Sequence, residues 1–231
     1  MKQLGQHPPP YHVIAHLSDP HLLAGGQMQY GAVDTEAGLR LALERLAAVD
    51  PPPQALAFTG DLADKAEPAA YARLREIVEP AAAAMGAEVV WVMGNHPAAP
   101  AADVARSRAD RAARPGPPRG ILAGHLHFST YSLFAGIPIS VASGGCYTSD
   151  PAPIDRFVSG VSSGQAFTMV HAYADRLVHT IVPLDRGTEV NGLGLDIKEA
   201  IEGLSVAEAR ELASSKTSAF NARHEDHDRP A

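Results

Sequence analysis

Short apolar runs recur along the first half of the chain, and each one ends in a small group of polar residues. The runs at 11–17, 54–59 and 87–93 have the length of buried strands. Between them, apolar positions recur at helical spacing over 34–48 and again over 67–85. Strands that alternate with helices are typical of a largely parallel sheet, so the pattern predicts an α/β fold.

Local signals bear on the ends of the two helices. Asp34 has the short acidic side chain that is favoured at a helix N-cap, and the prolines at 51–53 end the first helix. Pro80 falls inside the second helical segment, where a proline can break a helix. The first helix is therefore well delimited, and the second is expected with a candidate break at Pro80.

The second half of the chain changes character. Its apolar runs lie at 120–123, 130–134, 137–143, 166–173 and 177–183. Short turns join them, which indicates antiparallel hairpins. Further on, Ser205 and Glu208 form the sequence pattern of a capping box, which predicts a helix over 205–214.

One segment interrupts the regular pattern. Residues 97–119 hold eight Ala, five Pro and five Arg and no aromatic residue, so they cannot bury enough apolar surface to offset the entropy of ordering. We expect an irregular, low-complexity insert at 97–119 inside a domain at 11–185. A disordered lead at 1–10 would precede that domain, and an extension at 186–231, with a short helix and a charged tail, would follow it.

Composition narrows the function classes. The net charge of -7 disfavours binding of polymeric nucleic acid. It leaves a small anionic substrate open, because bound metal ions would set the local charge. No apolar run reaches the roughly 18 residues of a membrane helix, and the start lacks a signal-peptide core, so we expect a cytoplasmic protein. Cys146 is the only cysteine, which excludes a disulfide within the chain and predicts a packed thiol.

Four polar clusters directly follow strand-like runs. They are Asp19-x-His21, Gly60-Asp61, Gly94-Asn95-His96 and Gly124-His125-x-His127. Iron, manganese and zinc all accept carboxylate, imidazole and amide ligands, and two ions about 3.5–4 Å apart need several such groups with one bridging carboxylate. Each cluster alone is an ordinary turn. Together, in this order and each after a strand, they predict a two-metal site.

The same clusters carry a resemblance to a known family. D-x-H, G-D, G-N-H and G-H-x-H are similar to the signature of the calcineurin-like metallophosphoesterases. The flanking segments LSDPHL, FTGDLADKAEPAAY and ILAGHLHFST resemble the class III cyclic nucleotide phosphodiesterases of the mycobacterial type. The resemblance covers 11–96 and 120–185, and it implies a four-layer α/β/β/α sandwich.

The resemblance also implies roles for the matched residues. The first metal ion would be held by Asp19, His21 and His127, and the second by Asn95 and His125. Asp61 would bridge the two ions, which the resemblance restricts to iron, manganese or zinc. His96 would stand beside the substrate phosphate as a general acid or an electrostatic partner.

The implied activity is hydrolysis of 3′,5′-cyclic nucleotides such as cAMP to monophosphates by a metal-bound hydroxide. The metal ligands contact only phosphate and water, so 2′,3′-cyclic nucleotides and other small phosphodiesters stay open as substrates. Relatives form dimers, so a homodimer is a further expectation.

The chain departs from the family pattern in two places. Pro97 stands where the family carries an aspartate that orients the preceding histidine, so we expect His96 to lack that partner. The stretch between G-N-H and G-H-x-H is far shorter than in the family, and 97–119 holds no histidine for the second metal. We therefore expect an incomplete sandwich. The segment is either a shortened natural loop or the junction of a deletion or frameshift.

Two hypotheses follow. In the first, the chain is an active cyclic nucleotide phosphodiesterase in which water, His96, His224 or His227 fills the gap at the second metal. In the second, it is a degenerate relative, catalytically impaired, that keeps at most one metal site. Metal content separates them, because the first requires two ions per chain and the second one or none.

Overall fold

The computed structural model describes residues 8–96, 118–185, 187–188, 201 and 203–214, and it divides the chain into two units. One unit spans Pro10–Arg186, and the other contains α5 (Val206–Ser214). Residues 97–117 of the expected insert, most of the lead and most of the tail, with His224 and His227, lie outside the described residues. The expected domain boundaries stay a prediction. None of the described helices has both the length and the apolar character needed to cross a membrane.

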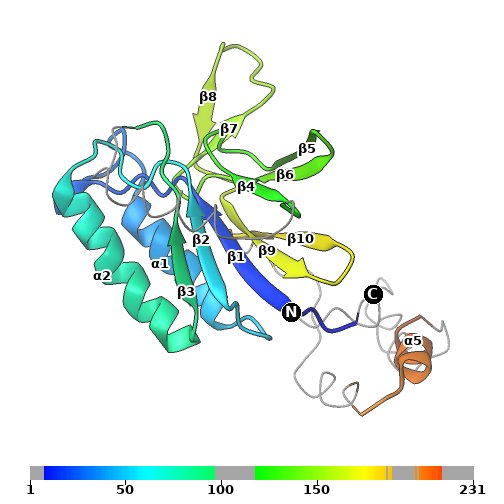
Figure 1. Ribbon diagram of the computed structural model, residues 1–231. Coiled ribbons are helices and arrows are strands. Elements are labelled where there is room, and N and C mark those ends of the chain that lie inside the picture. Colours follow the sequence, from blue (N-terminus) through cyan, green and yellow to red (C-terminus); the bar gives the residue numbers. More distant parts are fainter. Residues whose placement is uncertain (1–7, 97–117, 186, 189–200, 202, 215–231) are drawn as a thin grey trace, which may run out of the picture. The chain divides into compact units, whose positions relative to one another are not determined.

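A five-stranded sheet forms the centre of the larger unit (Figure 1). In sheet order its strands are β10 (Leu177–Pro183), β9 (Ala166–Ala172), β1 (His12–Ser18), β2 (Ala55–Thr59) and β3 (Glu88–Trp91). β1, β2 and β3 are parallel, whereas β9 pairs antiparallel with both β1 and β10. The parallel strands are connected through α1 (Thr35–Ala47) and α2 (Pro68–Met85), which confirms the predicted α/β class.

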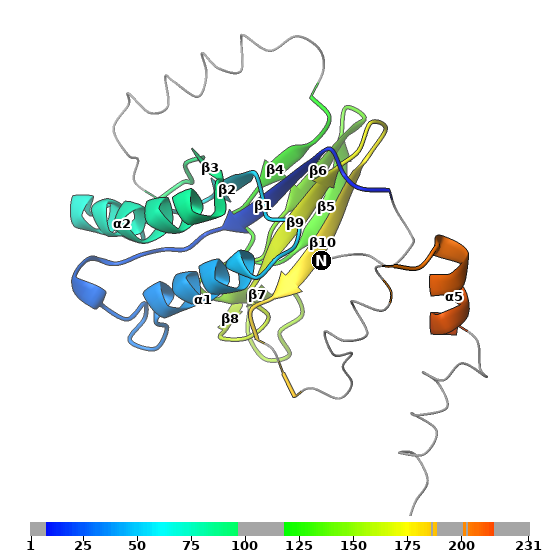
Figure 2. The same ribbon diagram turned by 90° about the horizontal axis from the view of Figure 1, so that it is seen from below.

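Both helices lie on the same face of this sheet (Figures 1 and 2). Leu39 and Leu46 of α1 and Leu74 and Val78 of α2 are buried at helical spacing, and they join alternate residues of β1, β2 and β9 in one core. The short 3-10 helix η1 (Ala24–Gly26) lies in the loop between β1 and α1. This layer holds the parallel strands in register and thereby sets where their carboxyl ends lie.

The helix ends agree with the local signals, with one exception. Asp34 caps α1 by accepting a hydrogen bond from the backbone N–H of Ala37, and Ser205 and Glu208 form the expected capping box of α5. Pro80, however, lies inside α2, which continues to Met85, so the candidate break is wrong. Pro80 is exposed, and the buried face of the helix stays packed on either side of it, which offsets the cost of the missing hydrogen bond.

A second sheet contacts the opposite face of the first. It holds three strands in the order β4 (Ile121–Ala123), β6 (Ile137–Val141) and β5 (Thr130–Phe134). The ring of Tyr131 on β5 lies 5.8 Å from that of His179 on β10. Within the described part of the larger unit no helix covers the outer side of this sheet, and Leu133 and Phe134 are exposed. The described residues therefore provide three of the four expected layers, α/β/β.

A separate hairpin follows the second sheet. It pairs β7 (Thr148–Asp150) with β8 (Ser159–Val161) in antiparallel fashion. The apolar pattern did not predict either strand, because both are three residues long and carry polar or small side chains. The loop that precedes β7 matters for the site, since it returns to the end of β1 through a parallel bridge between Ser18 and Gly144.

Candidate metal centre

Loops from both sheets meet at the carboxyl ends of β1 and β2. Asp19 and His21 follow β1, Asp61 follows β2 and His127 follows β4, and all four residues are between 0% and 5% exposed. The loops are joined by backbone hydrogen bonds, including one of 3.0 Å from the N–H of His21 to the carbonyl of Asp61. Four residues from three different segments thus share one buried position, as strand ends in an open sheet allow.

Asp19 lies at the centre of this group. Its Oδ2 accepts hydrogen bonds from the hydroxyl of Ser18 at 2.5 Å and from the backbone N–H of His125 at 2.7 Å. Its Oδ1 accepts one from the backbone N–H of Asp61 at 3.0 Å. Burial alone would disfavour a charged carboxylate, and three donors offset that cost and hold the group in one orientation.

His21 is held from one side and unpartnered on the other. Its Nδ1 lies 2.9 Å from Oδ1 of Asp64, and that same oxygen accepts a hydrogen bond from Nε2 of Gln29 at 2.8 Å. With Nδ1 donating to the carboxylate, Nε2 carries the lone pair. This Nε2 is buried, lacks a hydrogen-bond partner among the described residues, and lies 3.7 Å from Oδ2 of Asp61. A buried acceptor in this state fits the role of a metal ligand.

Asp61 faces two histidines. Its Oδ1 accepts a hydrogen bond of 2.7 Å from the backbone N–H of His96, and its Oδ2 lies 3.8 Å from Nε2 of the same residue. Nδ1 of His96 is 2.6 Å from the backbone carbonyl of Asp64, to which it donates. The backbone carbonyl of Asp64 therefore orients His96 in place of the aspartate that Pro97 replaces. A main-chain partner of this kind could not be predicted from the sequence.

His127 completes the buried group. Its Nε2 lies 3.9 Å from Oδ1 of Asp19, and its ring centroid is 5.1 Å from that of His21. On the other side, Nδ1 lies 3.2 Å from the carbonyl of Tyr147 and 3.7 Å from Sγ of Cys146. Burial lowers the pKa of His127, and the neutral imidazole that results is the form that binds metals.

The two residues expected to bind a second metal are not buried. The side chains of Asn95 and His125 are exposed, and within the described residues neither takes part in a hydrogen bond or an ion pair. His125 contributes only its backbone N–H, to Asp19. The structure thus brings together five of the seven predicted site residues, while the side chains of Asn95 and His125 are exposed and their role as ligands stays a prediction. The five are Asp19, His21, Asp61, His96 and His127.

The glycines of the motifs have a steric function. A Cβ on Gly60 or Gly124 would overlap the carboxylate of Asp19, and a Cβ on Gly94 would overlap that of Asp61. Each glycine precedes a motif residue and lets its own backbone approach a carboxylate from another loop. The close approach explains why the motifs begin with glycine.

The backbone of the motifs is also unusual. Four of the candidate residues adopt positive φ angles, namely 48° at Asp19, 45° at His21, 78° at His125 and 58° at His127. Residues with a side chain disfavour this region, at a cost of about 1–3 kcal/mol each. Such strain persists only where the surrounding structure enforces it, and it clusters at functional sites.

These observations fit a bound cation. Two groups have ligand atoms within 4.8 Å of one another, one of His21, Asp61 and His96 and the other of His21, His127 and Cys146. Both groups include His21. Oxygen and nitrogen ligands of this kind suit iron, manganese or zinc. The described residues therefore fit a metal position next to His21.

Sequence reasoning missed the residues that orient the ligands. Asp64 lies three positions after Asp61 in the same loop, and that spacing was an available signal. No sequence signal indicated Gln29 or the carbonyl of Tyr147. The position of Gln29 depends on long-range packing, and the carbonyl belongs to the main chain, which every residue carries. Metal-binding histidines usually donate their second nitrogen to such partners, so the pattern agrees with a ligand role.

Comparison with known proteins gives two related sequences. One is a cAMP/cGMP dual specificity phosphodiesterase of Mycobacterium tuberculosis (strain CDC 1551 / Oshkosh), 34% identical over 265 aligned positions that cover 80% of this chain and 83% of the relative. The other, from Rhodococcus erythropolis (strain PR4 / NBRC 100887), is named "Probable cyclic nucleotide phosphodiesterase" and is 33% identical over 291 positions, with 91% and 96% covered.

The chain is shorter than these relatives within the aligned region. An alignment of 265 positions that covers 80% of 231 residues uses about 185 of them, so about 80 positions have no counterpart in this chain. The second alignment, with 91% of the chain in 291 positions, gives the same difference of about 80. A deletion of that size agrees with the shortened stretch expected between the third and fourth motif clusters, G-N-H and G-H-x-H.

Fold comparison gives weaker likenesses. Vps29 of Chaetomium thermophilum, for example, is 8% identical with a TM-score of 0.36, and the match covers 77% of this chain and 98% of that one. A likeness at this level adds nothing to the assignment. The model of the calcineurin-like phosphoesterase family, in contrast, matches residues 12–145, which hold all four motif clusters. This match and the two relatives confirm the resemblance, and the chain belongs to the calcineurin-like phosphoesterase family.

Proposed function

We propose that the chain is a metal-dependent phosphodiesterase that hydrolyses cyclic nucleotides to monophosphates. The observation that carries the proposal is the buried group of Asp19, His21, Asp61 and His127, in which Nε2 of His21 has no partner among the described residues. A group of carboxylates and imidazoles with an orphaned acceptor is costly without a cation and favourable with one.

The metal position is proposed to be held by Asp19, His21 and His127, with Asp61 facing it from the next loop. Bound metal ions at such a site supply Lewis-acid stabilisation of the phosphate and activation of water. The identity of the ion, among iron, manganese and zinc, is part of the proposal. The chain's own contribution is to fix the ligands, since each one is buried and donates or accepts a second hydrogen bond.

His96 is proposed as the residue that acts on the substrate. It is 38% exposed, so it borders solvent while its Nε2 faces Oδ2 of Asp61 at 3.8 Å. The carbonyl of Asp64 accepts the Nδ1 proton and thereby fixes the ring. In this position Nε2 can hydrogen-bond a phosphoryl oxygen or give a proton to the leaving alkoxide.

The substrate class rests on the relatives. One of them is named for activity on both cAMP and cGMP, and the other for cyclic nucleotides in general. We propose the same class here, with cAMP as the first substrate to test. A cytoplasmic location and a homodimer stay predictions of the sequence.

A second candidate function is favoured by one specific observation. The side chains of Asn95 and His125 are exposed, and the chain lacks about 80 positions of its relatives. A chain with only the first metal position would be a catalytically impaired relative that binds one ion.

Metal content and turnover, measured on the same preparation, separate the two candidates. The full chain is loaded with Mn²⁺, Zn²⁺ or Fe²⁺, its metal content is measured by inductively coupled plasma mass spectrometry, and hydrolysis of cAMP and of bis(p-nitrophenyl) phosphate is followed. The enzyme proposal predicts turnover that is abolished in Asp61→Asn and unchanged in Asp175→Asn, an exposed control. Metal-loaded protein that hydrolyses neither substrate at any metal concentration would refute it and favour the one-metal relative.

A further inference from the structure

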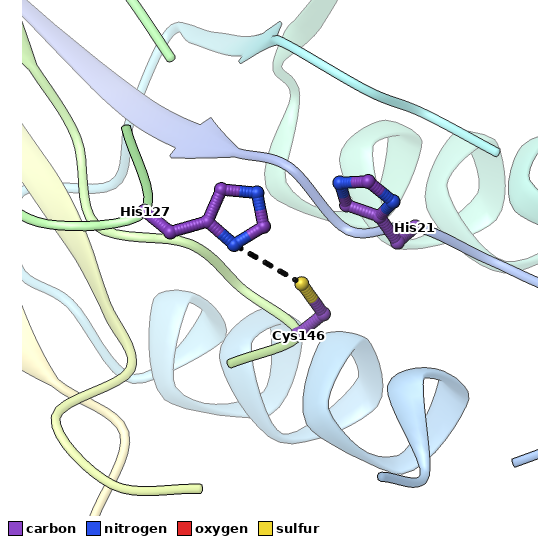
Figure 3. Close-up of side chains that lie close together, drawn as sticks. All are labelled: His21, His127 and Cys146. Carbon is purple, nitrogen blue, oxygen red and sulfur yellow. Dashed lines mark hydrogen bonds between the residues drawn. The ribbon is translucent and has the colours of Figure 1, made fainter. Parts of the chain in front are cut away.

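Cys146 lies buried beside two histidines of the first metal position. Figure 3 shows the side chains of His21, His127 and Cys146 turned toward one another. Sγ is 3.7 Å from Nδ1 of His127, and one ligand atom from each of the three residues lies within 4.8 Å of the others. Ligands that share one tetrahedral zinc ion at about 2.0–2.3 Å lie about 3.3–3.8 Å apart, so a bound ion would draw these three ligand atoms slightly closer together.

The main chain holds this cysteine in place. Gly145, next to it, donates a backbone hydrogen bond of 2.7 Å to the carbonyl of Ser18 at the end of β1. Gln165 donates a side-chain hydrogen bond of 3.1 Å to the carbonyl of Cys146 itself. The position of the sulfur is therefore set by contacts with β1 and with the residue that precedes β9. A ligand needs this kind of fixed support.

The hydrogen bonds of His127 decide which of its two ring nitrogens can bind a metal. The carbonyl of Tyr147 can only accept, so Nδ1 of His127 carries a proton when it bonds that oxygen at 3.2 Å. Nε2 is then the nitrogen of His127 that is left to bind a metal, and Sγ lies beside the N–H group on the other side of the ring edge.

A second observation points to the same place. His21 is 3% exposed, and its Nε2 has no hydrogen-bond partner within the described part of the chain. Its other nitrogen is held by Asp64, which aims Nε2 away from that carboxylate and toward the cluster. A buried lone pair and a buried sulfur therefore face a common position.

We propose that the thiolate of Cys146 is a ligand of the first metal ion, alongside His21 and His127. On binding, the thiol proton passes to solvent and a sulfur–metal bond forms, so one extra proton is released per ion. A soft sulfur ligand shifts the preference of the site toward zinc, cobalt or iron and away from manganese. The inference rests on the first metal position of the proposed function, but it does not depend on hydrolysis.

Cobalt substitution tests the proposal directly. The reduced full chain is titrated anaerobically with Co²⁺, and the near-ultraviolet spectrum is recorded for a sulfur-to-cobalt charge-transfer band. Because Cys146 is the only cysteine, a band in the wild-type chain assigns the ligand without any variant. We expect a band that saturates at one cobalt per chain. In Cys146→Ser the band disappears, and the affinity for zinc falls by at least about 10-fold.

Each other outcome overturns the proposal. Cobalt that binds without a near-ultraviolet band shows that sulfur is not a ligand, and a chain that binds no cobalt has no such site. The result is also distinct from that of the activity assay. A band without hydrolysis sinks the enzyme proposal alone, and hydrolysis without a band sinks the sulfur ligand alone.

Discussion

Asp64 offers the sharpest test of how the site is supported. Its Oδ1 accepts hydrogen bonds from Nδ1 of His21 and from Nε2 of Gln29, while its backbone carbonyl accepts one from His96. Substitution by alanine removes the carboxylate and leaves the carbonyl in place. The change therefore releases His21 and Gln29 and leaves the orientation of His96 intact.

The magnitude follows from the groups that lose their partner. His21 and Gln29 are 3% and 1% exposed, so both donors become unsatisfied inside the protein. Each such loss costs about 1–3 kcal/mol. The side chain of Asp64 is 14% exposed, which lets water reach part of the space it leaves. We expect Asp64→Ala to lower the free energy of unfolding by about 2–4 kcal/mol and the metal affinity by about 10–100-fold.

Asp64→Asn separates the two effects. The amide oxygen can accept the same two hydrogen bonds, so the free energy of unfolding should stay within about 1 kcal/mol of wild type. The neutral amide makes His21 a weaker base, so the metal affinity should still fall. Urea denaturation followed by circular dichroism gives the first quantity, and competition with a chromophoric chelator gives the second. Asp175→Ala, at a side chain that is 70% exposed, is the matched control.

The reasoning is refuted if Asp64→Ala unfolds at the same urea concentration as the control and binds metal with wild-type affinity. A loss of stability with unchanged metal affinity would limit Asp64 to a structural role. Equal losses of metal affinity in Asp64→Asn and in the Asp175→Ala control would show that the effect is not specific to this carboxylate.

Two further predictions concern sterics and charge. Gly94→Ala should reduce metal binding and destabilise the fold by about 1–3 kcal/mol, because the added Cβ would overlap Asp61. In the control Gly203→Ala the added Cβ meets open space, so this variant should bind metal as wild type does in the same titration. Glu36→Gln should lower the Tm by about 1–3 °C at pH 7, since hydrogen bonds from Arg73 lower the pKa of Glu36 to about 2. That stabilisation is present above pH 4.5 and is lost as the pH falls toward 2, so the Tm difference should vanish there, and a difference that persists would contradict it.

Apolar runs predicted the strands that lie between the helices and the second sheet. The runs that became β1, β2 and β10 differ from the observed bounds by at most one residue at either end, because their side chains alternate between a helix-covered face and a sheet-covered face. Asp34 predicted the start of α1 for a local reason that needs no tertiary contact. Pro80 was misjudged because packing of the buried face outweighs a local cost.

The candidate site was predictable in its members and less so in its geometry. Motif residues directly after parallel strands must share one edge of the sheet, which is why Asp19 and Asp61 could be placed together. The partners of His127, in contrast, come from the loop before β7, and that contact depends on how the second sheet docks. The exposed side chains of Asn95 and His125 could not be foreseen from spacing alone, because the same motif fits a turned-in or a turned-out side chain.

The positive φ angles at Asp19, His21, His125 and His127 have a consequence for how this chain can vary. At each position glycine or asparagine would relax the backbone, so replacing these residues would gain stability and lose a candidate metal ligand. Rigidity and chemistry therefore compete residue by residue along these loops.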